Sequence, residues 1–303
     1  MSASLPPLRE ALNAAGIRAD KRFGQHFLLD LNICRKIAKI ADISEGDHVL
    51  EVGPGPGGLT RALLEAGARV TAIERDDRFL PVLADLGRAF ADRLVVIHAD
   101  ALKLDEVAAV GSGVAVVANL PYNIASPLLV KWLTGPLRPS AMTVMFQAEV
   151  AHRITAQPDD HDYGRLAVLS QLIAEARIAM NLPARAFTPP PKVDSAVVRL
   201  VPRSDRPAEA VVAVLQTVTA AAFGQRRKML RSSLKRLGGA ALCEAVGVDP
   251  NARAETVPVA AFLAMARLVE ARAHQPWRDD QRISPSTKPF NHGLRARRCR
   301  SAR

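Results

Sequence analysis

The stretch HVLEVGPGPGG (48–58) decides the fold class, because it joins a buried strand to a glycine-rich turn. Its first part, HVLEVG (48–53), is short and mostly apolar, as in a strand that is covered on both faces. A helical segment, LTRALLEAG (59–67), follows and closes with glycine. Glycines at such a turn let the backbone approach a ligand closely, and the helix start adds N–H donors. The unit therefore predicts an α/β nucleotide-binding fold.

Strands and helices alternate on both sides of this unit. A helical pattern begins at Leu31, and another helix is predicted at 77–87. Short apolar strands separated by helices indicate a parallel sheet covered on both faces. A proline-rich segment, 187–202, ends in one more strand. The other strands are predicted at 68–74, 93–100, 114–121 and 141–147.

After about residue 204 the pattern becomes helical only, with helices predicted at 208–222, 226–237, 239–246 and 258–272. The fold class is therefore a Rossmann-like α/β sheet flanked by helices, plus a small C-terminal all-α domain. The predicted divisions are an N-terminal extension (1–20), a cofactor-binding catalytic domain (21–203), a helical RNA-binding domain (204–275) and a basic, disordered tail (276–303).

Charge and composition narrow the class of protein. The formal net charge is +11, which indicates a polyanionic partner such as nucleic acid. The tail alone carries +6, so residues 1–275 are only moderately basic, at +5. The three cysteines lack disulfide or zinc spacing, so no metal is expected. No apolar run is long enough to cross a membrane, and a cytoplasmic monomer is the expectation.

Two cofactor patterns overlap in the glycine turn. GPGPGG (53–58) fits the dinucleotide pattern G-x-G-x-x-G, and EVGPGPG (51–57) fits the methyltransferase pattern E-x-G-x-G-x-G. Gly53 and Gly55 belong to both. Glu74 ends the next strand, where a carboxylate can accept the ribose hydroxyls of either cofactor. The glycine turn and Glu74 therefore do not distinguish a dinucleotide from the cofactor of a methyltransferase.

Asp100 closes the third predicted strand. An acid at this position in a methyltransferase accepts a hydrogen bond from the adenine amino group of the cofactor. A strand-end Asp on its own is more often a helix cap. Its place as the third element in order favours the ligand.

NLPY (119–122), at the end of the fourth strand, favours the methyltransferase. The N6 lone pair of adenine is delocalised into the ring and is a poor nucleophile. The Asn119 side-chain carbonyl and the Leu120 backbone carbonyl would accept from the N6 hydrogens and localise that pair. Tyr122 would stack on the base, and positioning would supply most of the catalysis. The alternative is an ordinary strand-end turn.

A base taken from folded RNA must be held on two sides. Phe187, next to a stiff proline run, is the candidate for the second stacking surface. Core packing of Phe187 is the competing interpretation.

The ordered set of motifs resembles the bacterial ribosomal RNA adenine N6,N6-dimethyltransferases that act on the small subunit. The resemblance runs from about residue 20 to 272. It rests on KRFGQHFL (21–28), EVGPGPGGLT (51–60), IERD (73–76), HADAL (98–102), NLPYNIASPLL (119–129), FTPPPKVDSAVVRLVP (187–202) and AFGQRRKMLRSSLK (222–235).

The resemblance implies S-adenosylmethionine as cofactor and two adjacent adenosines, in a hairpin near the 3′ end of 16S rRNA within the small subunit, as substrate. It also implies a role in small-subunit assembly. His26, where the family often has Asn, and Leu28 would lie against the cofactor. Gly53, Glu74, Asp100 and Asn119 would complete its site. Ala148 stands where the family commonly has a basic residue.

QRRKMLRSSLKRL (225–237) carries six basic residues and no acid. If it is one helix, Arg227, Arg231 and Lys235 follow one face at i, i+4 and i+8, which suits phosphate contacts. Arg226 and Lys228 add to the expected RNA-binding set. A merely solvated face is the alternative.

Four other functions compete. A large-subunit adenine dimethyltransferase of the antibiotic-resistance type, or an organellar transcription factor derived from the same fold, would share the chemistry. An NAD-dependent oxidoreductase would explain the glycines but leaves NLPY and the basic helical part without a role. A noncatalytic ribosome assembly factor would need no intact cofactor site.

Overall fold

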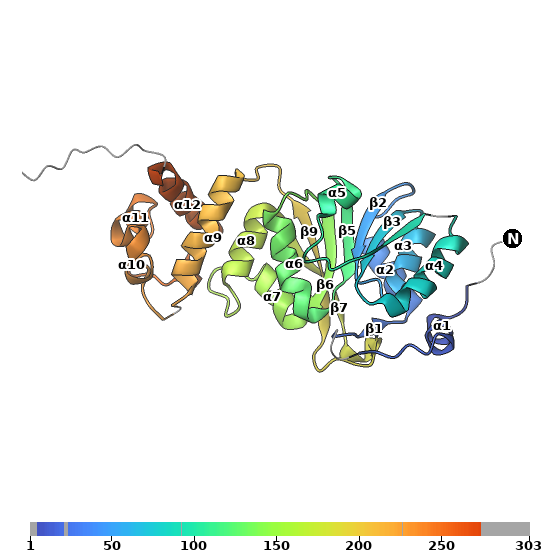
Figure 1. Cartoon of the computed structure of the whole chain (residues 1–303). Helices are drawn as coiled ribbons and strands as arrows, with labels where there is room; N and C mark the ends of the chain where they lie inside the picture. Colours follow the sequence, from blue (N-terminus) through green and yellow to red (C-terminus); the bar gives the residue numbers. More distant parts are fainter. Residues whose placement is uncertain (1–4, 21–23, 92, 226, 274–303) are drawn as a thin grey trace, which may run out of the picture.

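The computed structural model describes residues 5–20, 24–91, 93–225 and 227–273. Its centre is a seven-stranded sheet with the order β4-β3-β2-β5-β6-β9-β7 (Figure 1). The strands are β2 (His48–Val52), β3 (Arg69–Glu74), β4 (Leu94–His98), β5 (Ala115–Asn119), β6 (Ala141–Gln147), β7 (Ala174–Leu182) and β9 (Ser195–Pro202). The α/β fold class predicted from the sequence is confirmed.

The parallel arrangement holds for β4, β3, β2, β5 and β6, and it ends at β9. β9 runs antiparallel to β6, and β7 pairs antiparallel with β9 at the sheet edge. β7 has no counterpart among the strands predicted from the sequence. Its alternating AEARIAMNL pattern is half exposed and is interrupted by a bulge between Ile178 and Met180, so the strand lacks a continuous apolar signal.

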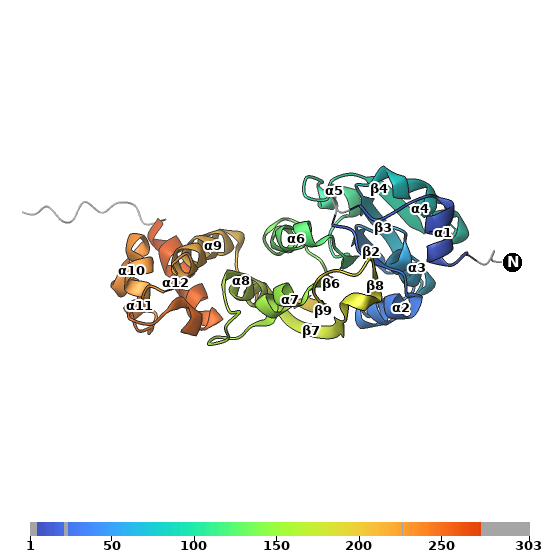
Figure 2. The same ribbon diagram turned by 90° about the horizontal axis from the view of Figure 1, so that it is seen from below.

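Helices cover both faces of the sheet (Figure 2). Successive strand residues point to opposite faces, so Leu50 joins one buried cluster and Val49 the other. The helices up to α8 are α1 (Leu8–Ala14), α2 (Leu31–Ile40), α3 (Gly58–Glu65), α4 (Leu80–Ala89), α5 (Glu106–Val110), α6 (Tyr122–Thr134), α7 (Ala148–Thr155) and α8 (Arg165–Ile173). The cluster around Val49 includes residues of α2 and α3, and the cluster around Leu50 includes residues of α6, α7 and α8.

The C-terminal part is helical, and it lies at the opposite end of the molecule from α1 (Figure 1). Its helices are α9 (Glu209–Phe223), α10 (Leu230–Ser233), α11 (Gly239–Ala245) and α12 (Val259–Ala273). The buried cluster around Leu50 continues into α9 and α12 without a break. The domain boundaries drawn from the sequence stay a prediction, and the tail lies outside the described residues.

The prediction of one helix over 226–237 is wrong. Met229 is extended (ψ 150°), α10 begins only at Leu230, and Gly238 ends the following short 3-10 turn. The amides of Leu230 and Arg231 donate to the carbonyls of Ala252 and Pro250, so they form tertiary rather than helical hydrogen bonds. The expected i, i+4, i+8 face therefore does not exist, although Leu230 is buried.

A second, two-stranded sheet lies beside the main one. β1 (Phe27–Leu28) pairs antiparallel with β8 (Phe187–Thr188). This pairing brings the N-terminal segment to the proline-rich loop, which is distant in sequence. None of the helices formed by the described residues is long and apolar enough to cross a membrane.

Candidate active site

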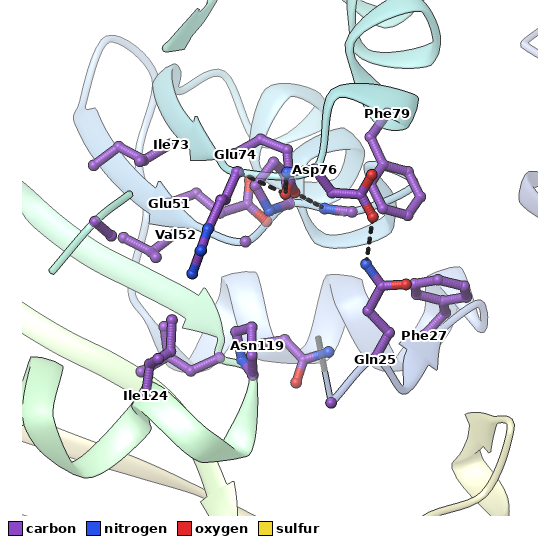
Figure 3. A pocket seen from close by; sticks show the side chains of 18 of the residues that line it. Gln25, Phe27, Glu51, Val52, Ile73, Glu74, Asp76, Phe79, Asn119 and Ile124 are labelled. Carbon is purple, nitrogen blue, oxygen red and sulfur yellow. Dashed lines mark hydrogen bonds between the residues drawn. The ribbon is translucent and has the colours of Figure 1, made fainter. Parts of the chain in front are cut away.

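A cavity of about 350 Å³ opens where the carboxyl ends of β2, β3 and β5 meet. The glycine turn, the end of β3, NLPY and the segment 24–28 all contribute to its lining. Figure 3 shows Glu74 and Asp76 on one side of it and Asn119 and Ile124 on the other. Ligands of open α/β sheets bind at this edge. The predicted cofactor and NLPY residues thus share one cavity.

The glycine turn packs directly against NLPY. Gly53 has φ +70°, and a Cβ there would lie 3.2 Å from the Pro121 ring and 4.0 Å from the Asn119 carbonyl oxygen. A side chain at this position would be strained and crowded. The glycine therefore lets the two motifs approach each other closely.

Glu74 is already bound by backbone amides. The N–H groups of Arg75 and Asp76 donate to its Oε1 at 2.8 and 2.7 Å, and the Gly55 N–H donates to Oε2 at 3.0 Å. Burial raises the pKa of Glu74 and these bonds lower it, with a net rise. A carboxylate has about four acceptor positions. Three of these positions are occupied, so one acceptor position of Glu74 remains open.

Glu51, the first residue of the methyltransferase pattern, is a buried acid of the cavity. Its side chain is 1% exposed, and Oε2 has no hydrogen-bond partner among the described residues. Burial, followed by the charge of Glu74, raises the pKa of Glu51 to about 8. Without a ligand Glu51 is therefore mainly a neutral acid at pH 7, and a cation placed at its free oxygen would favour the ionised form.

Asp100 has the capping role considered for it, and its role as a cofactor ligand stays a prediction. Its Oδ1 accepts from the Leu102 N–H at 3.0 Å, which caps the turn after β4. Its Oδ2 lies 3.6 Å from the Arg75 guanidinium, and both residues line the cavity. The capping oxygen leaves the second oxygen available to a ligand.

A polar network that the sequence did not reveal closes one end of the cavity. Gln25 Nε2 donates to Asp76 Oδ2 at 2.7 Å (Figure 3), and Arg78 donates to Asp76 Oδ1 at 2.8 Å. The Arg78 hydrogen bonds lower the pKa of Asp76. Phe27 packs edge-on against Phe79 at 5.6 Å beside this network. These contacts hold the segment 24–28 against the end of β3.

NLPY leads from β5 into α6, so Asn119 ends the strand and Tyr122 begins the helix. Leu120 is buried, whereas Asn119 and Tyr122 are partly exposed in the cavity. The Tyr122 hydroxyl and Ser195 Oγ share a hydrogen bond of 2.7 Å. Burial raises the pKa of Tyr122. The ring is therefore held in one orientation as a neutral phenol.

His26 and Leu28 line the cavity as expected, but Phe187 does not. Phe187 is 3% exposed and packs in the buried cluster that contains Leu28 and Val197. Its backbone pairs with Leu28 across β1 and β8. In this conformation the structure favours core packing, and a stacking role for Phe187 would require movement.

The predicted RNA-binding side chains lie away from the cavity, on α10 and the turns that flank it. Arg227, Lys228, Arg231 and Lys235 are exposed. Arg226 lies outside the described residues. Within the part of the chain that the structure describes, no group of acidic, histidine and cysteine side chains could hold a metal ion.

Comparisons with known proteins identify the family of this chain. The family model described as "Ribosomal RNA adenine dimethylase" matches residues 16–271. The chain belongs to this family. It is 62% identical to ribosomal RNA small subunit methyltransferase A of Phenylobacterium zucineum over 90% of this chain and 96% of that protein. It is 63% identical to the protein of the same name from Caulobacter vibrioides over 85% and 100%.

Two solved structures share the fold. A dimethyladenosine transferase from Plasmodium falciparum is 26% identical, with a TM-score of 0.68, over 82% of this chain and 98% of that one. The 23S rRNA methyltransferase ErmE is 28% identical, with a TM-score of 0.64, over 80% and 99%. The chain is thus an rRNA adenine methyltransferase, and its cofactor is S-adenosylmethionine.

The cavity fits that cofactor better than a dinucleotide. S-adenosylmethionine carries a sulfonium and an ammonium group, whereas NAD carries a pyrophosphate. Four acids line the cavity, and Glu51 has a free oxygen for a cation: Glu51, Glu74, Asp76 and Asp100. A lining rich in acids suits a cationic cofactor better than a pyrophosphate. The family match selects the methyltransferase pattern from the two that overlap in the glycine turn.

Proposed function

We propose that this enzyme dimethylates N6 of two adjacent adenosines in a hairpin near the 3′ end of 16S rRNA, within the small ribosomal subunit. The contact between Gly53 and NLPY carries the proposal, because it unites the cofactor turn with groups suited to an adenine amino group. The 62–63% identity to proteins named small subunit methyltransferase A supports the target. A cytoplasmic monomer that also takes part in small-subunit assembly fits this function.

Different residues of the site would bind different parts of the cofactor. When bound, the cofactor supplies a methyl group on a positively charged sulfur. Gly53, Gly55, Glu74 and Asp100 would hold its nucleoside part, and Leu28 and His26 would lie against it. Glu51 has the free carboxylate oxygen suited to its cationic end.

The target adenine would be held by NLPY. The Asn119 side-chain oxygen and the Leu120 carbonyl would accept from the N6 hydrogens and direct the lone pair toward the methyl group. Tyr122, fixed by Ser195, would stack on the ring. The N6 proton would leave to solvent after transfer, so no strong base is needed. Orientation and fixed dipoles would lower the barrier.

The RNA would approach along the exposed cations Arg227, Lys228, Arg231 and Lys235, with Arg226 as a further candidate. Phosphate contacts of this kind position RNA without reading its sequence. They lie on the helical part, so they would orient the subunit while the cavity receives the base.

The test is transfer of labelled methyl groups from S-adenosylmethionine to small subunits that lack the modification, followed by mass mapping. We expect dimethyladenosine at two neighbouring positions of one small-subunit hairpin. Large subunits are the control, because ErmE shares the fold. Label in large-subunit RNA alone would overturn the proposed target. Binding of cofactor and subunit without transfer would leave a noncatalytic assembly factor.

A further inference from the structure

His26 and Tyr122 form a ring contact inside the cavity that the proposed reaction does not use. Their ring centroids are 5.5 Å apart and their planes differ by 28°, so the rings are stacked. Among the described residues, His26 is the one whose ring stacks on Tyr122. Both side chains line the cavity. The imidazole therefore covers part of a face of the ring on which an adenine would stack.

The imidazole is anchored in that place. Its Nδ1–H donates to the Pro189 carbonyl oxygen at 2.8 Å. Pro189 directly follows β8, and β8 pairs with β1 through Phe27 and Thr188. The backbone on both sides of this hydrogen bond is thus held by one small sheet. The pairing of β1 with β8 and the hydrogen bond to Pro189 therefore fix the orientation of the His26 ring.

The Tyr122 ring is anchored at its other end. Its hydroxyl bonds Ser195 Oγ at 2.7 Å, and Ser195 is buried on β9. The ring cannot turn away from His26 without losing this bond. Each ring would lose one hydrogen bond by moving, but that of Tyr122 is partly buried and that of His26 is exposed, so movement of the imidazole is the smaller change by which this face becomes free.

The spacing leaves no room for a third ring. A planar base between two rings needs about 3.5 Å on each side, or about 7 Å between them. The centroid distance of 5.5 Å is too short for this arrangement. A base that stacks on this face of Tyr122 must therefore displace His26.

We propose that His26 is a placeholder for the target adenine, which covers Tyr122 until the base enters and displaces the imidazole. The inference rests on the proposed function. It gives His26 a role in admitting RNA, beside the contact with the cofactor expected from the family resemblance. Entry of the base breaks the stack of His26 on Tyr122 and the hydrogen bond of His26 to Pro189. Stacking of the base on Tyr122 replaces the lost stack.

The test compares variants that separate the ring from the hydrogen bond. His26→Ala removes both, His26→Asn keeps a donor without a ring, and His26→Phe keeps a ring without the donor. Initial rates on unmodified small subunits give KM for the subunit. We expect Ala and Asn to lower this KM by about three- to thirty-fold, and Phe to stay within about threefold of wild type. His161→Ala, at a side chain that is 96% exposed, is the matched control.

Calorimetry with S-adenosylmethionine alone separates this role from cofactor binding. An unchanged or raised KM in both His26→Ala and His26→Asn would overturn the proposal. A weaker cofactor Kd with no fall in KM would assign His26 to the cofactor only. A KM that follows the melting temperatures of the variants would show a structural role. Absence of transfer by the wild-type enzyme would instead overturn the proposed function, and this inference with it.

Discussion

At the scale of single residues, Glu51 links pH to stability. Its pKa is about 8 in the fold, against an ordinary value of 4.5. The folded chain therefore holds a proton that the unfolded chain has lost, so stability is full below about pH 4.5 and falls as the pH rises toward 8. Glu51→Gln removes this dependence. We expect the variant to gain on wild type by up to about 1.4 kcal/mol per pH unit in that window.

Urea unfolding of the cofactor-free proteins between pH 5 and pH 8 measures this difference. Glu149→Gln, on the exposed surface of α7, is the matched control and should stay parallel to wild type. S-adenosylmethionine should stabilise the wild type more than Glu51→Gln, because Glu51 can lose its proton and pair with the cationic end of the cofactor, whereas Gln cannot ionise. A pH-independent gap between Glu51→Gln and wild type would contradict the assignment.

Asn119 should matter to the reaction more than to the fold. Asn119→Ala removes the side-chain acceptor proposed for N6, and Tyr122→Ala removes the stacking surface. We expect each to lower methyl transfer by at least about a hundredfold, since one positioned dipole is worth roughly that much. Circular dichroism should stay unchanged. Near-normal methylation by both variants would disprove the proposed mechanism.

Glu74 should act mainly on cofactor binding. Glu74→Ala removes a charged acceptor and leaves the amides of Gly55, Arg75 and Asp76 without a partner. We expect the S-adenosylmethionine Kd to rise by about ten- to a hundredfold. Calorimetry measures it, and Glu74→Gln, which keeps an acceptor oxygen, should lose less. Equal Kd values for Glu74→Ala and wild type would remove Glu74 from the cofactor site.

At the scale of elements, the segment around α10 presents exposed cations without being one helix. Replacing Arg227, Arg231 and Lys235 together by Ala should weaken RNA binding and reduce the slope of log Kd against log salt by about 2 to 3. A titration of RNA binding at several salt concentrations measures both. The control is the triple variant of Lys36, Lys39 and Arg69, which are exposed cations on α2 and β3. An equal effect in both variants would indicate nonspecific charge.

At the scale of the whole molecule, one buried cluster joins the sheet to the C-terminal helices. It includes Leu50 of β2, Phe262 of α12 and the fully buried Tyr163 between them in sequence. The Tyr163 hydroxyl donates to the Val257 carbonyl at 2.8 Å, just before α12. A continuous core predicts that both parts unfold together, whatever the domain boundaries.

Tyr163→Phe tests this coupling. The variant leaves the Val257 carbonyl without this donor in a buried position, which should cost about 1 to 3 kcal/mol. The urea midpoint should fall in one transition with an unchanged slope, by both far-ultraviolet dichroism and the fluorescence of Trp132, which is buried on α6. Two separate midpoints would show that the helical part unfolds on its own.

Local patterns determined a large part of this protein. The glycine turn at 51–58 and NLPY predicted the strand ends that meet in the cavity, because the carboxyl ends of parallel strands share one edge of a sheet. Gly53 and Glu74 were identified for the same reason. A residue whose neighbours are set by strand order can be placed from the sequence.

Contacts between distant segments required the tertiary structure. The sequence could not show that His26 stacks on Tyr122, that Gln25 bonds Asp76, or that Phe187 is buried, since each depends on how β1 pairs with β8. The segment 226–237 was predicted as one helix from its periodicity, but the amides of Leu230 and Arg231 bond the loop at 250–252 instead. The spacing of apolar residues in the sequence indicates which side chains are buried. The hydrogen-bond partner of each polar group depends on which distant segments the fold places beside it, so only the tertiary structure shows it.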